Sequence, residues 1–327
     1  MDLIYRVAGG SIAAFLITVL LLKFLPGEKF LLGHDRGRKY AQGSAVNIGK
    51  PTGVGFYFTM VFAVASAVTC YFQPSFIMLI AAVVASMMTG FLDDRSKTAW
   101  GEYIKGLLDF IMSLTGAFLC VWFYGSDFVI AVTGTKIVIH PAVAYVLAVI
   151  LFVVSINATN ATDGIDGLSG SLSILSIATL FALSAINTGL ADCNKNGLIS
   201  GLIMISVLIA YLIFNFNPSK MLMGDAGSRA LGFFIAFYAI YLKIPFAYLI
   251  VGLPFICDGG ISIFKITVGR LTKKKIIPFK NITTPLHDEL RKNRGFKVRK
   301  VWVVLVTSAF ILDIIYIGIT LAIHAVR

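Results

Sequence analysis

Residues 198–216 read LISGLIMISVLIAYLIFNF, an uncharged and largely apolar run. The hydrocarbon core of a bilayer is about 30 Å thick, and a helix needs about 20 such residues to cross it. The run therefore predicts a membrane-spanning helix. Working outward from it, we count ten comparable runs, near residues 5–25, 55–72, 75–92, 106–124, 141–156, 168–186, 198–216, 229–243, 244–264 and 301–323.

The composition agrees with a chain made mostly of such runs. Hydrophobic residues make up 58% of the 327 residues and charged residues only 13%, which excludes an ordinary soluble protein. We expect a single all-α domain over residues 1–327, a polytopic bundle of about ten transmembrane helices. Lys243 and Pro245 predict a tight connection between the eighth and ninth helices. The first run is too long for a cleaved signal peptide, so we expect a permanent anchor.

The cysteine spacing argues against two kinds of site. Cys70, Cys120, Cys193 and Cys257 are scattered, and three of them lie inside apolar runs. They form neither a metal-ligand spacing nor a disulfide framework, and we interpret them as packing residues.

Positive charge is unevenly distributed along the chain. The loops after the first, third, seventh and ninth runs carry 23 of the 28 Lys and Arg residues. Because such loops stay in the cytoplasm, both termini are predicted to be extracytoplasmic and the helix count to be even. Orientation and attraction to anionic membrane lipids then explain the net charge of +12, and we expect no nucleic-acid partner. Residues 270–300 are predicted to form a basic cytoplasmic loop with a short interfacial helix.

Polar residues gather in five segments, at 49–55, 91–97, 157–167, 214–228 and 284–289. All five fall on the cytoplasmic side, although that side was assigned from Lys and Arg alone. An ionised group near lipid costs about 2.5–3.5 kcal/mol unless it is paired, hydrated or bound to a cation. The segments therefore predict one hydrated cytoplasmic cavity that holds five acids: Asp93, Asp94, Asp163, Asp166 and Asp225.

The residue types in these segments indicate a site for a cation and phosphate groups. Carboxylate oxygens without a nearby cysteine favour Mg²⁺ over zinc. Glycines punctuate three segments, and the even-numbered helices begin at this face, so their positive dipole ends suit phosphate. Lys50 and Lys97 are placed to contact a diphosphate. Neither a Walker A pattern nor a Rossmann fingerprint is present.

Simpler structural roles compete with this interpretation. The acids at 93 and 94 could cap the end of a helix, and those at 163 and 166 could form a turn. His287, the single histidine in a polar segment, could be a loop residue without chemistry. Three further acids lie inside apolar runs and are assigned no chemistry: Asp109, Asp258 and Asp313.

The polar segments, in this order, resemble the polyprenyl-phosphate N-acetylhexosamine-1-phosphate transferase superfamily over residues 45–300. Segments 157–167 and 223–232 are most similar to the family that transfers phospho-N-acetylmuramoyl-pentapeptide in bacteria. This resemblance implies ten helices, a Mg²⁺ cofactor and a place in the cytoplasmic membrane, with the active site facing the cytoplasm. It also implies that UDP-N-acetylmuramoyl-pentapeptide and undecaprenyl phosphate react to give lipid I and UMP. A homodimer is a possible assembly.

The resemblance also implies roles for individual residues. Asp225 matches the family's metal ligand, and Asp93 with Asp94 matches its essential acidic pair. His287 matches the first residue of a catalytic histidine motif. The positions that line the nucleotide and diphosphate site are matched by Lys50, Lys97, Asn160, Asp163, Asp166 and Asn215.

Two departures from the family pattern keep other functions open. His287, Asp288 and Glu289 stand where three consecutive histidines are usual, and Leu222 stands where a phenylalanine often stacks on uracil. A transferase for N-acetylglucosamine-1-phosphate is therefore the nearest alternative. A cation-coupled transporter is a more distant one, because transporters place their charges near the bilayer midplane and here the acids lie at helix ends.

Overall fold

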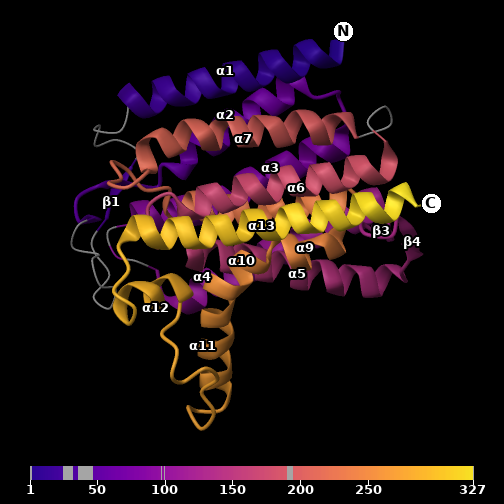
Figure 1. Cartoon of the computed structure of the whole chain (residues 1–327). Coiled ribbons are helices and arrows are strands. Elements are labelled where there is room, and N and C mark those ends of the chain that lie inside the picture. Colours follow the sequence, from indigo (N-terminus) through magenta and orange to yellow (C-terminus); the bar gives the residue numbers. More distant parts are fainter. Residues whose placement is uncertain are drawn as a thin grey trace.

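The computed structural model describes residues 2–24, 32–35, 47–96, 98, 100–189 and 194–326. Figure 1 shows long helices that run side by side. They are α1 (Asp2–Phe24), α2 (Gly55–Thr69), α3 (Pro74–Arg95), α4 (Glu102–Tyr124), α5 (Pro141–Thr162), α6 (Leu168–Thr188), α7 (Lys195–Asn215), α8 (Gly224–Tyr241) and α13 (Val298–Ala325).

The ninth apolar run is broken into short pieces. It comprises η2 (Pro245–Ala247), α9 (Tyr248–Val251), α10 (Leu253–Phe255), the π-helical turn η3 (Ile256–Gly260) and α11 (Ile261–Leu271). The parts on either side of Gly252 are bent by 54°. A short helix, α12 (Leu286–Lys292), follows inside the basic 270–300 segment. Two hairpins, β1 (Gly33–His34) with β2 (Pro51–Thr52) and β3 (Asp127–Ile130) with β4 (Thr135–Val138), join the helices.

The expected helical membrane bundle is confirmed. Each of the ten apolar runs forms a helix or, in the ninth, a chain of short helices. By length and composition, seven of the described helices can span a membrane, and the bent pair raises this number to eight. Helix α2 is shorter than these spans, and α8 does not reach their hydropathy. The count of ten spans therefore stays a prediction.

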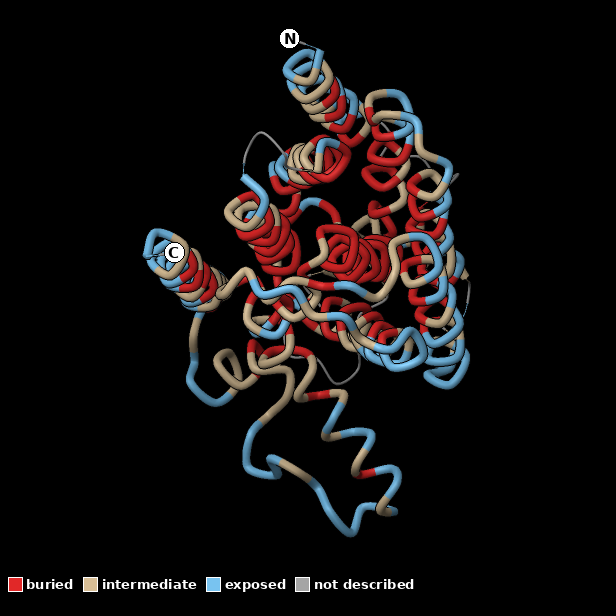
Figure 2. Tube along the Cα trace, turned by 90° about the vertical axis from the view of Figure 1, so that its right-hand side faces the viewer, coloured by how far each residue is buried: buried red, intermediate tan, exposed pale blue. Residues whose placement is uncertain are grey.

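Helix α8 forms the centre of the bundle. Every residue from Asp225 to Tyr241 is buried, and α2, α3, α4, α5 and α6 all contact the helix. Figure 2 shows the buried residues gathered in the middle and the exposed ones on the outer helices. Because protein covers α8 on all sides, it can carry Asp225 and Arg229 without presenting them to lipid.

Glycines allow α2 and α3 to touch the first turn of α8. A Cβ atom on Gly55 would lie 2.0 Å from the backbone nitrogen of Gly227, and one on Gly90 would lie 2.2 Å from the carbonyl oxygen of Asp225. No side chain fits at such distances, so the backbones are in direct contact. The end of α3, with its two acids, is thereby held against the start of α8.

At the opposite end of the bundle, Lys243 links the end of α8 to the end of α4 and to β3. This residue has a left-handed φ of 65°, and its ammonium donates to the carbonyl of Tyr124 and, at 2.7 Å, to Asp127 Oδ1. Helix α8 ends before it and η2 begins at Pro245, so the predicted tight connection is confirmed. Both termini lie at this end in Figure 1.

Candidate active site at the start of α8

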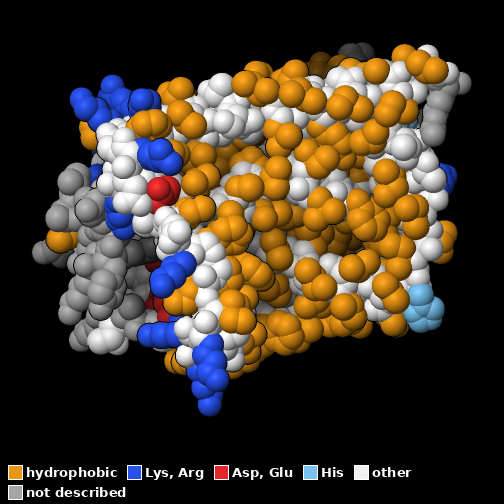
Figure 3. All heavy atoms as spheres, turned by 60° about the horizontal axis from the view of Figure 1, so that its bottom comes forward, with side chains coloured by type: hydrophobic (Ala, Val, Ile, Leu, Met, Phe, Trp, Pro, Cys, Tyr) orange, Lys and Arg blue, Asp and Glu red, His pale blue; other side chains and the backbone are white. Residues whose placement is uncertain are grey.

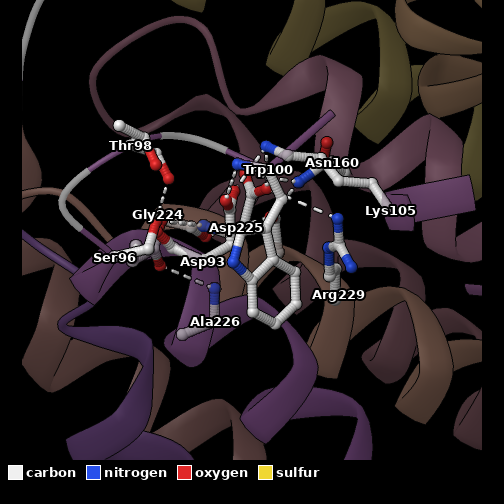
Figure 4. A network of polar contacts seen from close by, with 12 residues as sticks. Asp93, Ser96, Thr98, Trp100, Lys105, Asn160, Gly224, Asp225, Ala226 and Arg229 are labelled. Atoms are coloured by element: carbon white, nitrogen blue, oxygen red, sulfur yellow. Dashed lines mark hydrogen bonds and ion pairs between the residues drawn. The ribbon is translucent and has the colours of Figure 1, made fainter. Parts of the chain in front are cut away.

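Asp225, in the first turn of α8, is the hub of a buried polar network (Figure 4). Its Oδ2 atom accepts a hydrogen bond from Lys105 Nζ at 3.0 Å, and its Oδ1 atom accepts one from Asn160 Nδ2 at 3.0 Å. Arg229 Nη2 lies 3.5 Å from Oδ2. Helices α4, α5 and α8 each supply part of this cluster, so it exists only in the folded bundle.

Lys105 joins Asp225 to Asp93. Its ammonium lies 2.5 Å from Asp93 Oδ2, and Asp93 Oδ1 accepts the backbone N–H of Trp100 at 2.6 Å. Asp93 is 6% exposed, so its charge depends on these partners. Lys105 is a site residue that the sequence patterns did not predict. Its one signal was a lysine near the start of a largely apolar helix.

Asp94 caps α8 rather than its own helix. Its Oδ1 atom accepts the backbone N–H of Asp225 at 3.1 Å, and its Oδ2 atom accepts that of Ala226 at 2.9 Å. A carboxylate at a helix N-terminus satisfies free N–H groups and complements the helix dipole. Gly224, with a φ of 69°, makes room, because a Cβ atom there would lie 2.3 Å from Asp94 Oδ2. Asp94 therefore fixes the backbone that carries Asp225.

Asp166 and Lys50 meet in a neighbouring cluster. Asp166 Oδ2 accepts the side-chain amide of Asn217 at 2.9 Å and the backbone N–H of Ser219 at 3.1 Å. Lys50 Nζ donates to Ser219 Oγ at 3.0 Å and to Asn47 Oδ1 at 2.7 Å. This cluster ties the loop before α2 to the loops before α6 and α8.

Asn215 holds the same loops together from the end of α7. Its Oδ1 atom accepts the backbone N–H of Gly167 at 2.8 Å, and its Nδ2 atom donates to the carbonyl of Met221 at 2.8 Å. Trp302, at the start of α13, donates to Ser171 Oγ at 3.1 Å on the neighbouring turn of α6. Asn215 thus fixes the loops before α6 and α8 relative to each other, beside the network of Asp225.

His287 pairs with an acid from the broken ninth helix. Its backbone N–H donates to Asp258 Oδ1 at 2.7 Å, and its Nδ1 atom lies 2.8 Å from Asp258 Oδ2. The residues are 3% and 1% exposed. With Nδ1 facing a carboxylate, Nε2 is the ring atom directed at the 157–167 segment, where a Cβ atom on Gly164 would lie 2.4 Å from it. Asp258 is therefore a functional candidate that the sequence alone did not indicate.

The two residues after His287 have partners of their own. Asp288 Oδ2 lies 2.8 Å from Lys292 Nζ. Glu289 accepts the backbone N–H of Thr283 at 2.8 Å and the amide of Asn293, and the Thr283 bond in particular lowers the pKa of Glu289. Both acids therefore order α12 and the turn before it, and His287 alone faces the neighbouring segment.

The predicted site residues fall into connected groups. Asp93, Asp94, Asn160 and Asp225 share one network, while the neighbouring groups are Lys50 with Asp166 and Asn215, and His287 with Asp258. Segment 157–167 touches all three groups, and Asp163 lies half-buried within it. Lys97 lies outside the described residues.

The donor atoms of the central network fit a hard divalent cation. The network holds four carboxylates, of Asp93, Asp94, Asp109 and Asp225, and two cationic side chains, of Lys105 and Arg229, so full ionisation leaves two negative charges. Oxygen donors are what Mg²⁺ prefers. The Lys105 ammonium between Asp93 and Asp225 shows that these carboxylates share a cation. Among the described residues, no group of three or more acids, histidines or cysteines is already arranged as a metal site.

The part of the chain that carries this network matches a known protein family. A profile of glycosyl transferase family 4 matches residues 76–243, which include every member of the central network. The phospho-N-acetylmuramoyl-pentapeptide-transferase of Treponema pallidum (strain Nichols) is 33% identical over 285 residues, covering 82% of this chain and 77% of that protein. The protein of that name from Staphylococcus carnosus is 29% identical over 333 residues, covering 96% and 98%.

Proposed function

We propose, from the premise that this chain belongs to glycosyl transferase family 4, that it transfers phospho-N-acetylmuramoyl-pentapeptide from its UDP conjugate to undecaprenyl phosphate. The products are lipid I and UMP. Relatives named for this transfer match most of the chain, one of them along nearly its whole length. The observation that carries the proposal is the buried network of Asp93, Lys105 and Asp225 within the matched region.

The proposed location is the bacterial cytoplasmic membrane, with ten spans and the site on the cytoplasmic side. The chain is a multi-pass membrane protein, and Figure 3 shows an apolar surface with Lys, Arg and acidic side chains gathered at one end. That end carries the basic 270–300 segment. Because Lys and Arg mark the cytoplasmic side, the site and this segment are assigned to it.

Asp225 and Asp93 are the residues that would hold Mg²⁺. Bound there, the ion would supply positive charge for the diphosphate oxygens, whose negative charge spreads in the transition state. Lys105 already holds the two carboxylates in place. Asp94 fixes the first turn of α8, so that the carboxylate of Asp225 need not reorganise during the reaction.

The proposed reaction is a direct displacement at phosphorus. A phosphate monoester has a second pKa near 6, so the lipid phosphate is largely anionic at neutral pH and needs little help from a base. One of its oxygens forms a bond to the β-phosphorus of the donor, the bond from that phosphorus to the bridging oxygen breaks, and UMP leaves. Asp93 orients the acceptor phosphate. A covalent phospho-aspartate at Asp93 is the competing route.

One assay tests the proposal and its nearest alternative. Purified protein is given undecaprenyl phosphate, Mg²⁺ and either UDP-N-acetylmuramoyl-pentapeptide or UDP-N-acetylglucosamine, and UMP release is measured. We expect UMP release with UDP-N-acetylmuramoyl-pentapeptide and not with UDP-N-acetylglucosamine. Chelation of the metal should abolish this release. UMP release only with UDP-N-acetylglucosamine would support the alternative function, a transferase for N-acetylglucosamine-1-phosphate. That alternative stays open because Asp288 and Glu289 stand where the family usually has histidines.

The same assay separates the two routes. After incubation with donor labelled in its sugar and without acceptor, the chain should carry no covalent label. Label retained by the native chain and absent from Asp93→Asn would establish the covalent route.

A further inference from the structure

Arg229 is among the largest fully buried side chains in the described part of the chain. It lies one helical turn after Asp225 on α8, and its side chain is 1% exposed. The side chain faces Asp225 in Figure 4. A guanidinium remains charged at any physiological pH, so this position holds a permanent positive charge inside the bundle.

Two carboxylates share this charge. Arg229 Nη1 lies 3.0 Å from Asp109 Oδ1, and Arg229 Nη2 lies 3.5 Å from Asp225 Oδ2. Asp109 is 6% exposed and lies one turn after Lys105 on α4. Helices α4 and α8 therefore each present a cation and an acid four residues apart, and both cations reach Asp225.

Stability alone gives no reason for this arrangement. Removing a guanidinium and a carboxylate from water costs several kcal/mol each, and apolar residues of similar size are often equally or more stabilising. Within the described part of the chain, Arg229 Nε and Nη1 have no hydrogen-bond partner, and Nη1 contacts Asp109 only as an ion pair, so the guanidinium is not fully satisfied. What distinguishes the pair is its position directly behind the carboxylate that is assigned to the cation.

We propose that Arg229, anchored by Asp109, is a positioning residue that sets how strongly the Asp225 site binds a divalent cation. Its charge stands beside Asp225 Oδ2, on the same oxygen that Lys105 contacts, and offsets part of the negative charge available to the cation. Asp109 keeps the guanidinium in place at the distance observed. The inference rests on the proposed function for the identity of the site, but its test does not depend on turnover.

The test replaces the buried pair by apolar residues. In the double variant Asp109→Leu with Arg229→Met, no buried charge is left alone, so the protein should remain monodisperse in detergent. Binding of Mn²⁺, a spectroscopic substitute for Mg²⁺, is measured by electron paramagnetic resonance without any donor or acceptor. We expect at least about 3-fold tighter binding, because the lost positive charge of Arg229 contacts Asp225 directly, whereas the lost negative charge of Asp109 contacts only Arg229.

Matched variants separate this effect from a general structural one. Arg229→Lys keeps the charge and should bind Mn²⁺ within about 2-fold of the native protein. Asp127→Asn, at the opposite end of the bundle, should leave binding unchanged. The proposal is overturned if the double variant binds Mn²⁺ as the native protein does or more weakly, or if the native protein binds none.

The Mn²⁺-binding measurement and the UMP-release assay test different proposals, so a negative result in one does not imply a negative result in the other. Native protein that binds Mn²⁺ but releases no UMP from either donor would remove the proposed function, while the comparison of metal affinities would still decide the role of Arg229.

Discussion

At the scale of single residues, Asp225 illustrates what the chain alone can and cannot reveal. The acids at positions 93, 94 and 225 could be predicted as a cluster, because charged residues at the ends of apolar runs need a common explanation. The partner Lys105 could not, because it comes from α4 and only tertiary packing brings it to Asp225. Arg229 lies four residues after Asp225 on the same helix, so helical spacing alone brings these two side chains together. Sequence patterns thus indicate which ionisable side chains need a partner, but they do not identify a partner that comes from another helix.

Replacement of Lys105 by methionine should abolish most of the activity. Without the ammonium, Asp93 and Asp225 repel each other and lose the fixed geometry that transfer requires. We expect UMP release to fall by about 100-fold, as for other preorganised charged groups. Lys136→Met, on the exposed strand β4, is the matched control and should retain native activity. Equal losses in the two variants would contradict a specific role.

Gly224 provides a test of the contact between Asp94 and α8. Gly224→Ala places a Cβ atom 2.3 Å from Asp94 Oδ2 and must also adopt the left-handed φ of 69°, so the cap cannot form as observed. Gly295 has a similar φ of 67° but open space around it, so Gly295→Ala should cost only about 1–2 kcal/mol. Thermal unfolding and UMP release measure both variants. We expect Gly224→Ala to be inactive, and activity comparable to that of Gly295→Ala would refute the role of the close approach.

At the scale of elements, the broken ninth helix explains why the sequence does not reveal the role of Asp258. The apolar run at 244–264 was predicted as one helix, whereas it is bent by 54° and contains a π-helical turn at the acid. A π turn inserts a residue into the helix and commonly occurs at functional sites. Periodicity cannot detect it, because the surrounding residues are apolar on every side. The turn is what directs Asp258 at His287.

Asp258→Asn should impair His287 without removing it. The amide can still accept the backbone N–H of His287, but it no longer provides a carboxylate for Nδ1, so the ring loses its preferred tautomer and orientation. We expect UMP release to fall by about 10-fold or more. In the double variant with His287→Ala, the loss should equal that of His287→Ala alone. Additive losses would show that the two residues act separately.

At the scale of the whole molecule, the positions of the helices followed from composition, but the depth of each helix in the bundle did not. All ten apolar runs contain helices, and Lys243 with Pro245 separates the eighth from the ninth as predicted. Helix α8 is buried on all sides although it is less apolar than the seven spans, whereas α13 is as apolar as those spans and is largely exposed. In a membrane protein, lipid-facing and protein-facing residues are both apolar, so hydropathy does not distinguish them.

The predicted orientation can be tested with single cysteines. In a background with all four native cysteines replaced by serine, Asp2→Cys and Val326→Cys should react with a membrane-impermeant maleimide in intact spheroplasts. Lys275→Cys, in the basic segment, should react only after the membrane is broken. Labelling of the two terminal positions on opposite sides would mean an odd number of spans and would refute the assigned topology.

The central position of α8 also bears on how the protein is made. This helix is not apolar enough to count among the described spans, and it carries both an acid and an arginine. A segment of that kind has little tendency to leave the translocation machinery for lipid by itself, and it needs earlier helices to receive it. Helices α2 to α6, which contact α8, all precede it in the chain. They are therefore synthesised before α8 emerges from the ribosome. The order of the helices along the gene thus matches the order in which the bundle can be assembled.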